Sequence, residues 1–314
     1  MKKPFRYNLG RIMQIRELPA LVFLLLAVVF LWNKAPNFGE HANLLSIARE
    51  TSIVGIMAVG MTAVILTGGI DLSVASVLAL SASVIAILAV NGSNLLIAIL
   101  AGLGIGTACG ALNGLLITFL RIPPIITTLG TMAIYRAAVT LFTQAKWIGP
   151  LPAGMAFIGS KITPAFILFL IATITSLFLW KCRLGRYIQA IGGNENAVHL
   201  SGISVRKVKL LVYMLNGFLA TVAGLVMASS ANSAQANMAL GYELNVIAAV
   251  VIGGTSISGG QGSVIGSVLG AAIMSVLYSA LILLDASIYW HKLILGGVIL
   301  AAVLLDKFRY LTKQ

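Results

Sequence analysis

Apolar residues run along this chain in long stretches, separated by short polar or glycine-containing turns. The hydrocarbon core of a bilayer is about 30 Å thick, and a helix needs about 20 residues to cross it. The pattern therefore predicts an all-α integral membrane protein, a polytopic bundle of about ten transmembrane helices. The predicted spans lie near residues 18–32, 44–66, 72–90, 95–120, 124–143, 164–180, 210–230, 244–255, 263–284 and 288–305, the first and eighth being short.

Composition supports this interpretation. Of the 314 residues, 59% are apolar and 9% are charged, whereas about 25% are charged in a typical soluble domain. A soluble protein of this size has no core large enough to bury so much apolar surface. This excludes an ordinary cytosolic enzyme, a disordered chain and a secreted disulfide scaffold. We expect one transmembrane domain over residues 1–314.

The distribution of positive charge predicts the orientation. The net charge of +13 suggests nucleic acid in a soluble protein, but in a membrane protein Lys and Arg gather in cytoplasmic loops. With the amino terminus inside, fifteen Lys and Arg lie in inside segments and four in outside loops. Both termini should then be cytoplasmic and the number of spans even. Eight spans would also satisfy this condition.

Two loops are longer than the rest. The outside loop, residues 144–163, contains Trp147 and two prolines and is not expected to be a simple helix. The cytoplasmic loop, residues 182–209, is polar and basic. In it, Asn194 can cap a short helix that runs to Ser201, and Gly202 can end that helix. Such a surface helix is suited to docking a soluble partner, and a passive loop is the alternative.

A polar break interrupts the apolar pattern at residues 68–73, which read Gly-Gly-Ile-Asp-Leu-Ser. Asp71 either caps the following helix or contacts a substrate, because an acid at membrane depth is often functional. Arg136 lies midway along the fifth predicted span and should face a polar interior. Together with Ser73 and Asn113, these two residues are our candidates for a translocation path.

Glycines recur every four residues on two predicted spans. This spacing keeps them on one helix face, where a neighbouring backbone can approach closely. Such a face could allow two helices in close contact to slide or rock against each other, or it could serve only static packing of the helices. The glycines in question are Gly102, Gly106, Gly110, Gly114, Gly262, Gly266 and Gly270.

Motifs for chemistry are missing from the sequence. There is no Gly-x-x-x-x-Gly-Lys-Ser/Thr loop for ATP. The two cysteines, Cys109 and Cys182, lie in different surroundings, and no spacing suits a metal. We therefore expect no catalytic residue, no metal site and no cofactor in this chain.

Three motifs together resemble a known family. They are residues 68–73, residues 192–203 (Gly-Gly-Asn-Glu-Asn-Ala and Ser-Gly-Ile within them) and the glycine-rich residues 253–270. In this order they resemble monosaccharide ABC importer permeases of the ribose, galactoside and arabinose type. Residues 128–131, Tyr135–Arg136, 146–148 and 151–152 look most like the autoinducer-2 import permeases, with rhamnose and ribose types close behind.

The resemblance implies a place in the cytoplasmic (inner) membrane of a bacterium and a division of labour between subunits. A second permease chain, identical or related, would complete the channel. A cytoplasmic ABC ATPase would bind and use ATP, and an extracytoplasmic binding protein would deliver a small neutral sugar. The family's ATPase-coupling helix falls on Gly193, Asn194, Ala197, Ser201 and Gly202 of this chain. Nucleic acid is not an expected partner.

Two other classes of function remain open from the residues alone. An autonomous secondary transporter or channel would need an ion-coupling site, usually acids or histidines within spans. Only Asp71, Glu243 and Asp285 approach membrane depth, each beside a predicted break or end. A membrane enzyme would need clustered acids, histidines or nucleophiles, and the sequence offers none.

Overall fold

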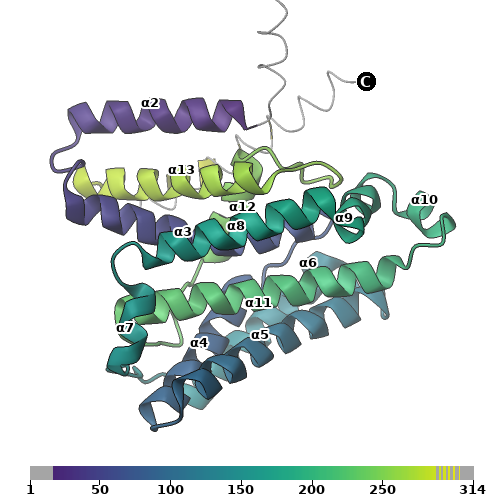
Figure 1. Cartoon of the computed structure of the whole chain (residues 1–314), viewed down its shortest axis with the longest axis horizontal. Helices are drawn as coiled ribbons and strands as arrows, with labels where there is room; N and C mark the ends of the chain where they lie inside the picture. The colour runs from purple at the N-terminus through teal and green to yellow at the C-terminus, as the bar shows by residue number, and fades with distance from the viewer. Residues whose placement is uncertain are drawn as a thin grey trace, which may run out of the picture.

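The structure is a computed structural model that describes residues 17–287, 290, 293, 294, 296, 297, 300 and 304. Within these residues the regular elements are α-helices, and a single β-bridge joins Ile148 to Ala234. Figure 1 shows most of the helices running side by side along the long axis of the molecule. The helices are α2 (Leu18–Lys34), α3 (His41–Leu66), α4 (Val74–Val90), α5 (Leu95–Thr118), α6 (Pro124–Thr143), α7 (Ala153–Gly159), α8 (Thr163–Lys181), α9 (Arg183–Gly193), α10 (Glu195–Leu200), α11 (Val205–Ala231), α12 (Tyr242–Ile252) and α13 (Val264–Leu283).

The all-helical prediction is confirmed, but the number of about ten spans is not. Six helices are long and apolar enough to cross a membrane, namely α3, α5, α6, α8, α11 and α13, and three further apolar helices are shorter. The eighth predicted span corresponds to α12, whose 11 residues rise only about 16 Å, too little to cross a bilayer alone. The tenth, at residues 288–305, lies mostly outside the described residues.

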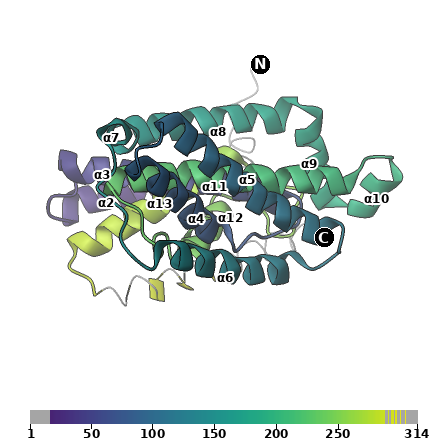
Figure 2. The same cartoon turned by 90° about the horizontal axis from the view of Figure 1, so that it is seen from below.

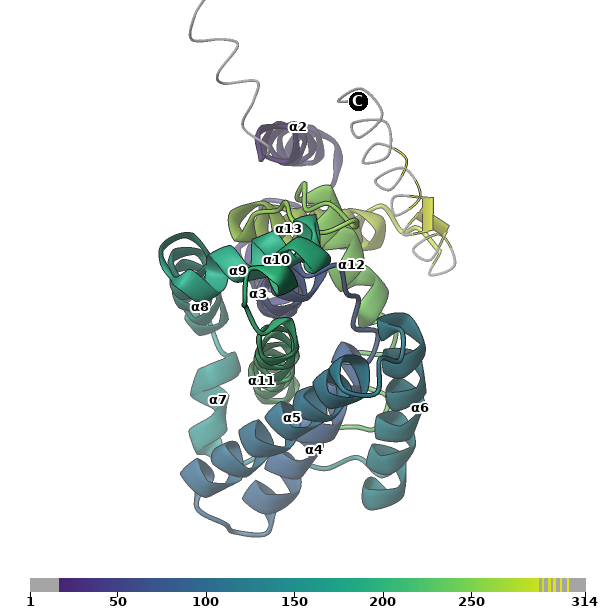
Figure 3. The same cartoon turned by 90° about the vertical axis from the view of Figure 1, so that its right-hand side faces the viewer.

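Helix α3 forms the centre of the bundle. Every residue from Ser52 to Leu66 is buried, so this helix is covered by protein on all sides. In contrast, only 22% of the apolar window of α8 is buried, against 83% for α3. Figures 2 and 3 place α8 and α6 on opposite sides of the molecule with α11 between them. Helices such as α8 therefore present apolar surface suited to contact with lipid.

The two long loops lie at opposite ends of the bundle. Helix α7 forms part of the 144–163 loop at one end, and α9 and α10 form part of the 182–209 loop at the other, with α8 running between them (Figure 1). The sequence did not predict α7 or α9. Helix α9 places apolar Ile188 and Ile191 against the bundle. Burial of these two side chains holds the helix in place, whereas the polar and basic composition of the loop gave no indication of a packed helix.

Backbone-to-backbone contacts join α5 to α11. A Cβ atom on Gly110 would collide with the carbonyl oxygen of Tyr213, and one on Gly106 would collide with the side chain of Thr221. The contact is reciprocal, since Gly217 of α11 lies against the carbonyl group of Gly106. Of the other two glycines in this series, Gly114 also faces α11 at Leu210, whereas Gly102 faces Ile85 of α4.

The second glycine series lies along α12 and α13. Gly266 packs against the carbonyl oxygen of Gly253, and Gly270 packs against that of Ala249. Gly262 precedes α13, where a Cβ atom would come within 2.6 Å of the Thr255 side chain. Both series therefore lie where another backbone or a closely packed side chain leaves no room for a larger residue, and we propose that they serve helix packing.

Two alanine substitutions on α5 test this proposal. Gly110→Ala should lower the thermal stability of the purified protein, because overpacking a close contact costs about 1–3 kcal/mol. Gly104→Ala is its matched control, since Gly104 is exposed on the same helix with nothing within 4 Å of a built Cβ. Replacing this glycine should leave stability unchanged or raise it by up to about 1 kcal/mol. Equal unfolding temperatures for both variants would contradict close packing at Gly110.

Candidate functional site

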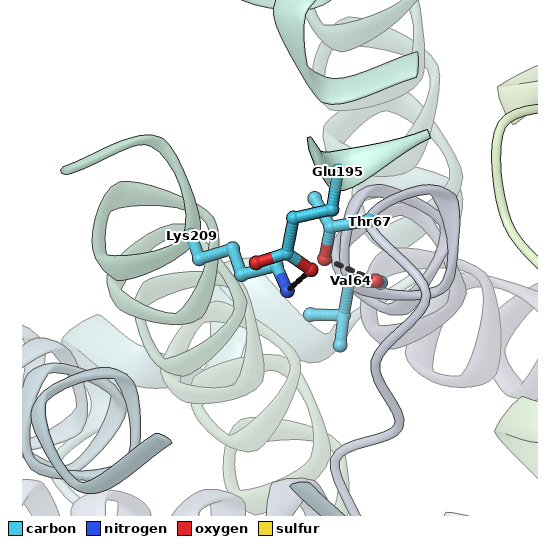
Figure 4. Close-up of polar contacts among 4 residues, drawn as sticks. All are labelled: Val64, Thr67, Glu195 and Lys209. Carbon is cyan, nitrogen blue, oxygen red and sulfur yellow. Dashed lines mark hydrogen bonds and ion pairs between the residues drawn. The ribbon is translucent and has the colours of Figure 1, made fainter. Parts of the chain in front are cut away.

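The break between α3 and α4 is built from the end of one helix and the start of the next. Helix α3 ends where the Thr67 hydroxyl and amide groups donate to the carbonyl oxygen of Val64, at 2.7 and 3.0 Å (Figure 4). Gly68 then takes a φ of +77°, a left-handed conformation that glycine adopts without strain. Helix α4 begins at Val74, and its 17 residues rise about 25 Å. Between the two helices, Thr67, Gly69, Asp71 and Ser73 are buried, whereas Gly68 is exposed.

Asp71 is the centre of a buried polar network in this break. One carboxylate oxygen accepts hydrogen bonds from the amide and hydroxyl groups of Ser73, at 2.9 and 2.6 Å. The other accepts from the side-chain amide of Asn216 on α11, at 2.8 Å. Asn113 on α5 donates to the Ser73 hydroxyl oxygen, also at 2.8 Å. Asp71 is 2% exposed and the other three side chains are 0% exposed, so the network ties the break to two neighbouring helices away from solvent.

The network combines both roles considered for Asp71. The carboxylate accepts the Ser73 amide at the start of α4, as expected for a residue that caps this helix, and it also reaches across to α11. Three buried oxygen atoms around it, Asn113 Oδ1, Asn216 Oδ1 and Tyr213 Oη, make no hydrogen bond within the described part of the chain. Asn216 was absent from the sequence-based candidates. An amide in an otherwise apolar span was the signal that could have identified it.

Arg136 lies apart from this network. Its guanidinium group donates to the carbonyl oxygens of Ala236 and Met238, at 2.7 and 2.9 Å, in the segment between α11 and α12. Its polar surroundings are thus mainly backbone carbonyl groups, supplemented by the charge of Glu243 at the start of α12. The structure brings together Asp71, Ser73 and Asn113, and it places the fourth candidate elsewhere.

A second candidate site is the segment around α10, at one end of the bundle. Asn194 caps the helix by accepting a hydrogen bond from the Ala197 amide at 3.0 Å. The Ser201 hydroxyl donates to the Ala197 carbonyl oxygen at 2.9 Å, and Gly202 takes a φ of +80° where the helix ends. Apart from Val198, residues 193–202 are exposed, so a capped helix projects from the bundle and leaves its surface free for contact.

An ion pair holds this projecting helix to the bundle. The Glu195 carboxylate lies 2.6 Å from the Lys209 ammonium group on α11, and Figure 4 shows this pair together with the end of α3. The Lys209 side chain is only 17% exposed. A groove of about 850 Å³ lies between the turn from α5 to α6 and the segment from α10 to α11, with Pro123 on one side and His199 and Arg206 on the other.

Leu200 is the functional candidate that the sequence analysis missed. It is 87% exposed, more than any of the other large apolar side chains described on the surface. Its position on a capped helix beyond the end of the bundle separates it from the apolar surfaces along the long helices. The sequence does not indicate which way a side chain in this loop points, so the high exposure of Leu200 is seen only in the structure. No group of three or more His, Cys, Asp or Glu side chains in the described residues is placed to bind a metal.

Comparison with known proteins gives the family. Residues 43–303 match the family described as the branched-chain amino acid transport system permease component. This chain belongs to that family. The match includes the break at residues 68–73, a second helix break between α12 and α13 (residues 253–263), and the α9–α10 segment. The sites described above therefore lie within the region that defines the family.

Several relatives share most of the chain. It is 40% identical to the ribose import permease protein of Escherichia coli over 93% of this chain and 94% of that protein. The ribose import permease protein of Bacillus subtilis is 42% identical, over 91% of this chain and 90% of that protein. The autoinducer 2 import system permease protein of Salmonella typhi is 35% identical, over 93% of this chain and 85% of that protein. No solved structure matches the chain.

Replacing the buried carboxylate tests the network at the break. In Asp71→Asn, one carboxylate oxygen is replaced by an NH2 group, which is a donor. This group must face either Ser73 or Asn216, and both of these residues donate a hydrogen bond to Asp71. We expect this variant to lose about 1–3 kcal/mol of stability, because a buried donor is left unsatisfied. The control is Asp285→Asn, since Asp285 is exposed with a φ of +53° that asparagine tolerates.

The measurement is thermal unfolding of both purified variants in the same detergent. The account predicts a lower midpoint for Asp71→Asn and a midpoint close to that of the original protein for Asp285→Asn. If both variants unfold with the original protein, the hydrogen bonds of Asp71 do not stabilise the break.

Proposed function

We propose that this chain is the membrane-spanning permease subunit of an ATP-driven ABC importer. Its substrate would be a small neutral sugar or sugar-like molecule, of the ribose, autoinducer-2 or rhamnose type, carried across the cytoplasmic membrane. The observation that carries this proposal is the 40–42% identity to ribose import permeases over at least 90% of both chains. Both named ribose permeases share more identical residues with the chain than the autoinducer-2 permease does.

The proposed importer divides its tasks among several chains. A separate ABC ATPase binds and hydrolyses ATP, an extracytoplasmic binding protein delivers the sugar, and a second permease chain completes the channel. This chain contributes no covalent chemistry, no metal and no cofactor. When the ATPase subunits close on ATP, the bundle would change from an outward-open to an inward-open state.

The proposed orientation places both termini and the α9–α10 segment in the cytoplasm. Two observations support it. The positive charges are concentrated in the segments assigned to that side. The two long loops also lie at opposite ends of the bundle, as this orientation requires (Figure 1).

The ATPase would dock on α10. In this proposal Asn194 fixes the start of the helix, while Ala197 and Ser201 form a small-residue face that fits a cleft in the partner. Gly193 and Gly202, which have no side chain, let the chain turn tightly just before and just after the helix. We add Leu200 as the apolar anchor, because an exposed side chain surrounded by polar residues gains free energy when a partner buries it.

The polar network at the break is the proposed lining of the translocation path. The unengaged oxygens of Asn113, Asn216 and Tyr213 are neutral acceptors suited to the hydroxyl groups of a sugar. Asp71 and Ser73 would hold these groups in place. All five side chains are buried in this conformation, so contact with sugar requires the bundle to open. Arg136 would position the segment between α11 and α12 at the other end of the path.

A secondary transporter is the second candidate, favoured by one observation. Asp71 is a buried acid whose described hydrogen-bond partners are all neutral, and ion-coupled transporters use such acids. Proteoliposomes containing the chain, its ATPase and its binding protein distinguish the two functions. The proposed importer takes up radiolabelled ribose or autoinducer-2 only with ATP. Uptake driven by a proton or sodium gradient, without ATP, would favour the secondary transporter.

A charge on the apolar anchor tests the docking helix. Leu200→Asp should abolish co-purification of the ATPase subunit, because a carboxylate would have to be buried in the interface. The permease itself should still reach the membrane, since Leu200 packs on nothing in the bundle. Leu240→Asp is the control, because Leu240 is 69% exposed near the other end, in the segment that contacts Arg136. Co-purification of the ATPase with both variants would show that Leu200 is not part of the interface.

A further inference from the structure

Three segments that are distant in sequence meet at the base of the coupling helix. They are the end of α3 (Leu66 and Gly68), the end of α9 (Gly192) and the turn between α12 and α13 (Gly259 and Gly260). We call these five residues the glycine junction. A Cβ atom on Gly192 would collide with the carbonyl oxygen of Leu66 and with the amide nitrogen of Gly260. The contact is therefore between backbones, with no side chain in between.

The junction is also close-packed from the side of the α12–α13 turn. A Cβ atom on Gly259 would lie 3.0 Å from both the Gly192 Cα and the Gly68 nitrogen. The Gly260 amide donates a hydrogen bond to the carbonyl oxygen of Leu66 at 3.0 Å. Both turn glycines have positive φ angles, +89° and +73°, which other residues adopt only with strain. The hydrogen bond thus joins the α12–α13 turn to the end of α3, and close van der Waals contacts join both segments to the end of α9.

Each segment of the junction leads directly to an element that matters for transport. Gly192 is three residues before the first residue of α10, the proposed ATPase-docking helix. Gly68 is three residues before Asp71, the centre of the buried polar network. Gly260 is four residues before the start of α13. A displacement of α10 would therefore reach both helix breaks through adjacent backbone, without passing along a flexible side chain.

We infer that the glycine junction transmits the movement of the coupling helix to the two helix breaks. Close-packed backbones leave almost no free volume between them. A displacement of one segment therefore either displaces the others or breaks the contact. Gly192, Gly259 and Gly260 are thus positioning residues for ATP-driven transport. They do not contact ATP or sugar. This inference rests on the proposed function, because it requires an ATPase that moves α10.

Two helical glycines provide a matched pair of variants. Gly192→Ala places a methyl group against two backbones, whereas Gly104→Ala, on α5, places one where nothing lies within 4 Å. Both variants are reconstituted with the ATPase and the sugar-loaded binding protein. In Gly192→Ala we expect the sugar-stimulated part of ATP hydrolysis, and uptake, to fall about tenfold per assembled complex. Basal hydrolysis and ATPase co-purification should stay normal, and Gly104→Ala should behave as the original protein.

This readout separates coupling from a purely structural role. A contact that only holds loops together would lower basal hydrolysis, stimulated hydrolysis and uptake in proportion to the amount of complex assembled. Normal stimulation in Gly192→Ala, with complex present, would overturn the inference. If the original protein itself shows no ATP-dependent uptake, the proposed function fails, and that result is distinguishable from failure of the junction.

A second pair covers the case in which Gly192→Ala does not reach the membrane. Gly260→Ala approaches the junction from the α12–α13 turn, and it should show the same loss of stimulation. Its control is Gly241→Ala, which has a comparable positive φ of +87° and nothing within 4 Å of a built Cβ. If both junction variants fail to insert while both controls insert, the junction serves folding and the inference is overturned.

Discussion

The structure depends on how the chain satisfies its backbone where its helices break. A buried amide or carbonyl group that loses its contact with water needs a partner within the protein. At the break before α4, the partners are the Asp71 carboxylate for the Ser73 amide and the Val64 carbonyl oxygen for the amides of Thr67 and Gly69. At the turn before α13, the Leu66 carbonyl oxygen receives the Gly260 amide. Each break is therefore held by another break or by a neighbouring helix.

This constraint explains why the coupling segment and the bundle interior are joined. Backbones can approach one another this closely only where no Cβ intervenes, and glycines meet that condition at the junction and along α5. The exposed residues are arranged differently. Helix α10 is capped by its own Asn194 and held by one ion pair, Glu195–Lys209. It can thus bind a partner without loss of the hydrogen bonds that the bundle needs.

Local patterns predicted much of this arrangement and tertiary contacts decided the rest. The break at residues 68–73 and the cap at Asn194 were predictable, because turn glycines and capping side chains act within a few residues. Long apolar runs predicted about ten spans, and six of these correspond to helices long and apolar enough to cross a membrane. The same rule also counted α12, which is too short to cross alone. The hydrogen bonds of Arg136 were not predictable, since backbone carbonyl groups leave no signature in a sequence. The contact between Gly192 and Gly260 could not be predicted either, because it joins residues that are far apart in the chain.

In the mechanism we propose, docking at α10 and the state of both helix breaks are linked through one backbone contact. Hydrogen–deuterium exchange of the reconstituted complex, with and without a non-hydrolysable ATP analogue, measures this link. We expect exchange to change together in three segments, residues 66–73, 192–202 and 253–263. A change confined to residues 194–202, with both breaks unaffected, would contradict it.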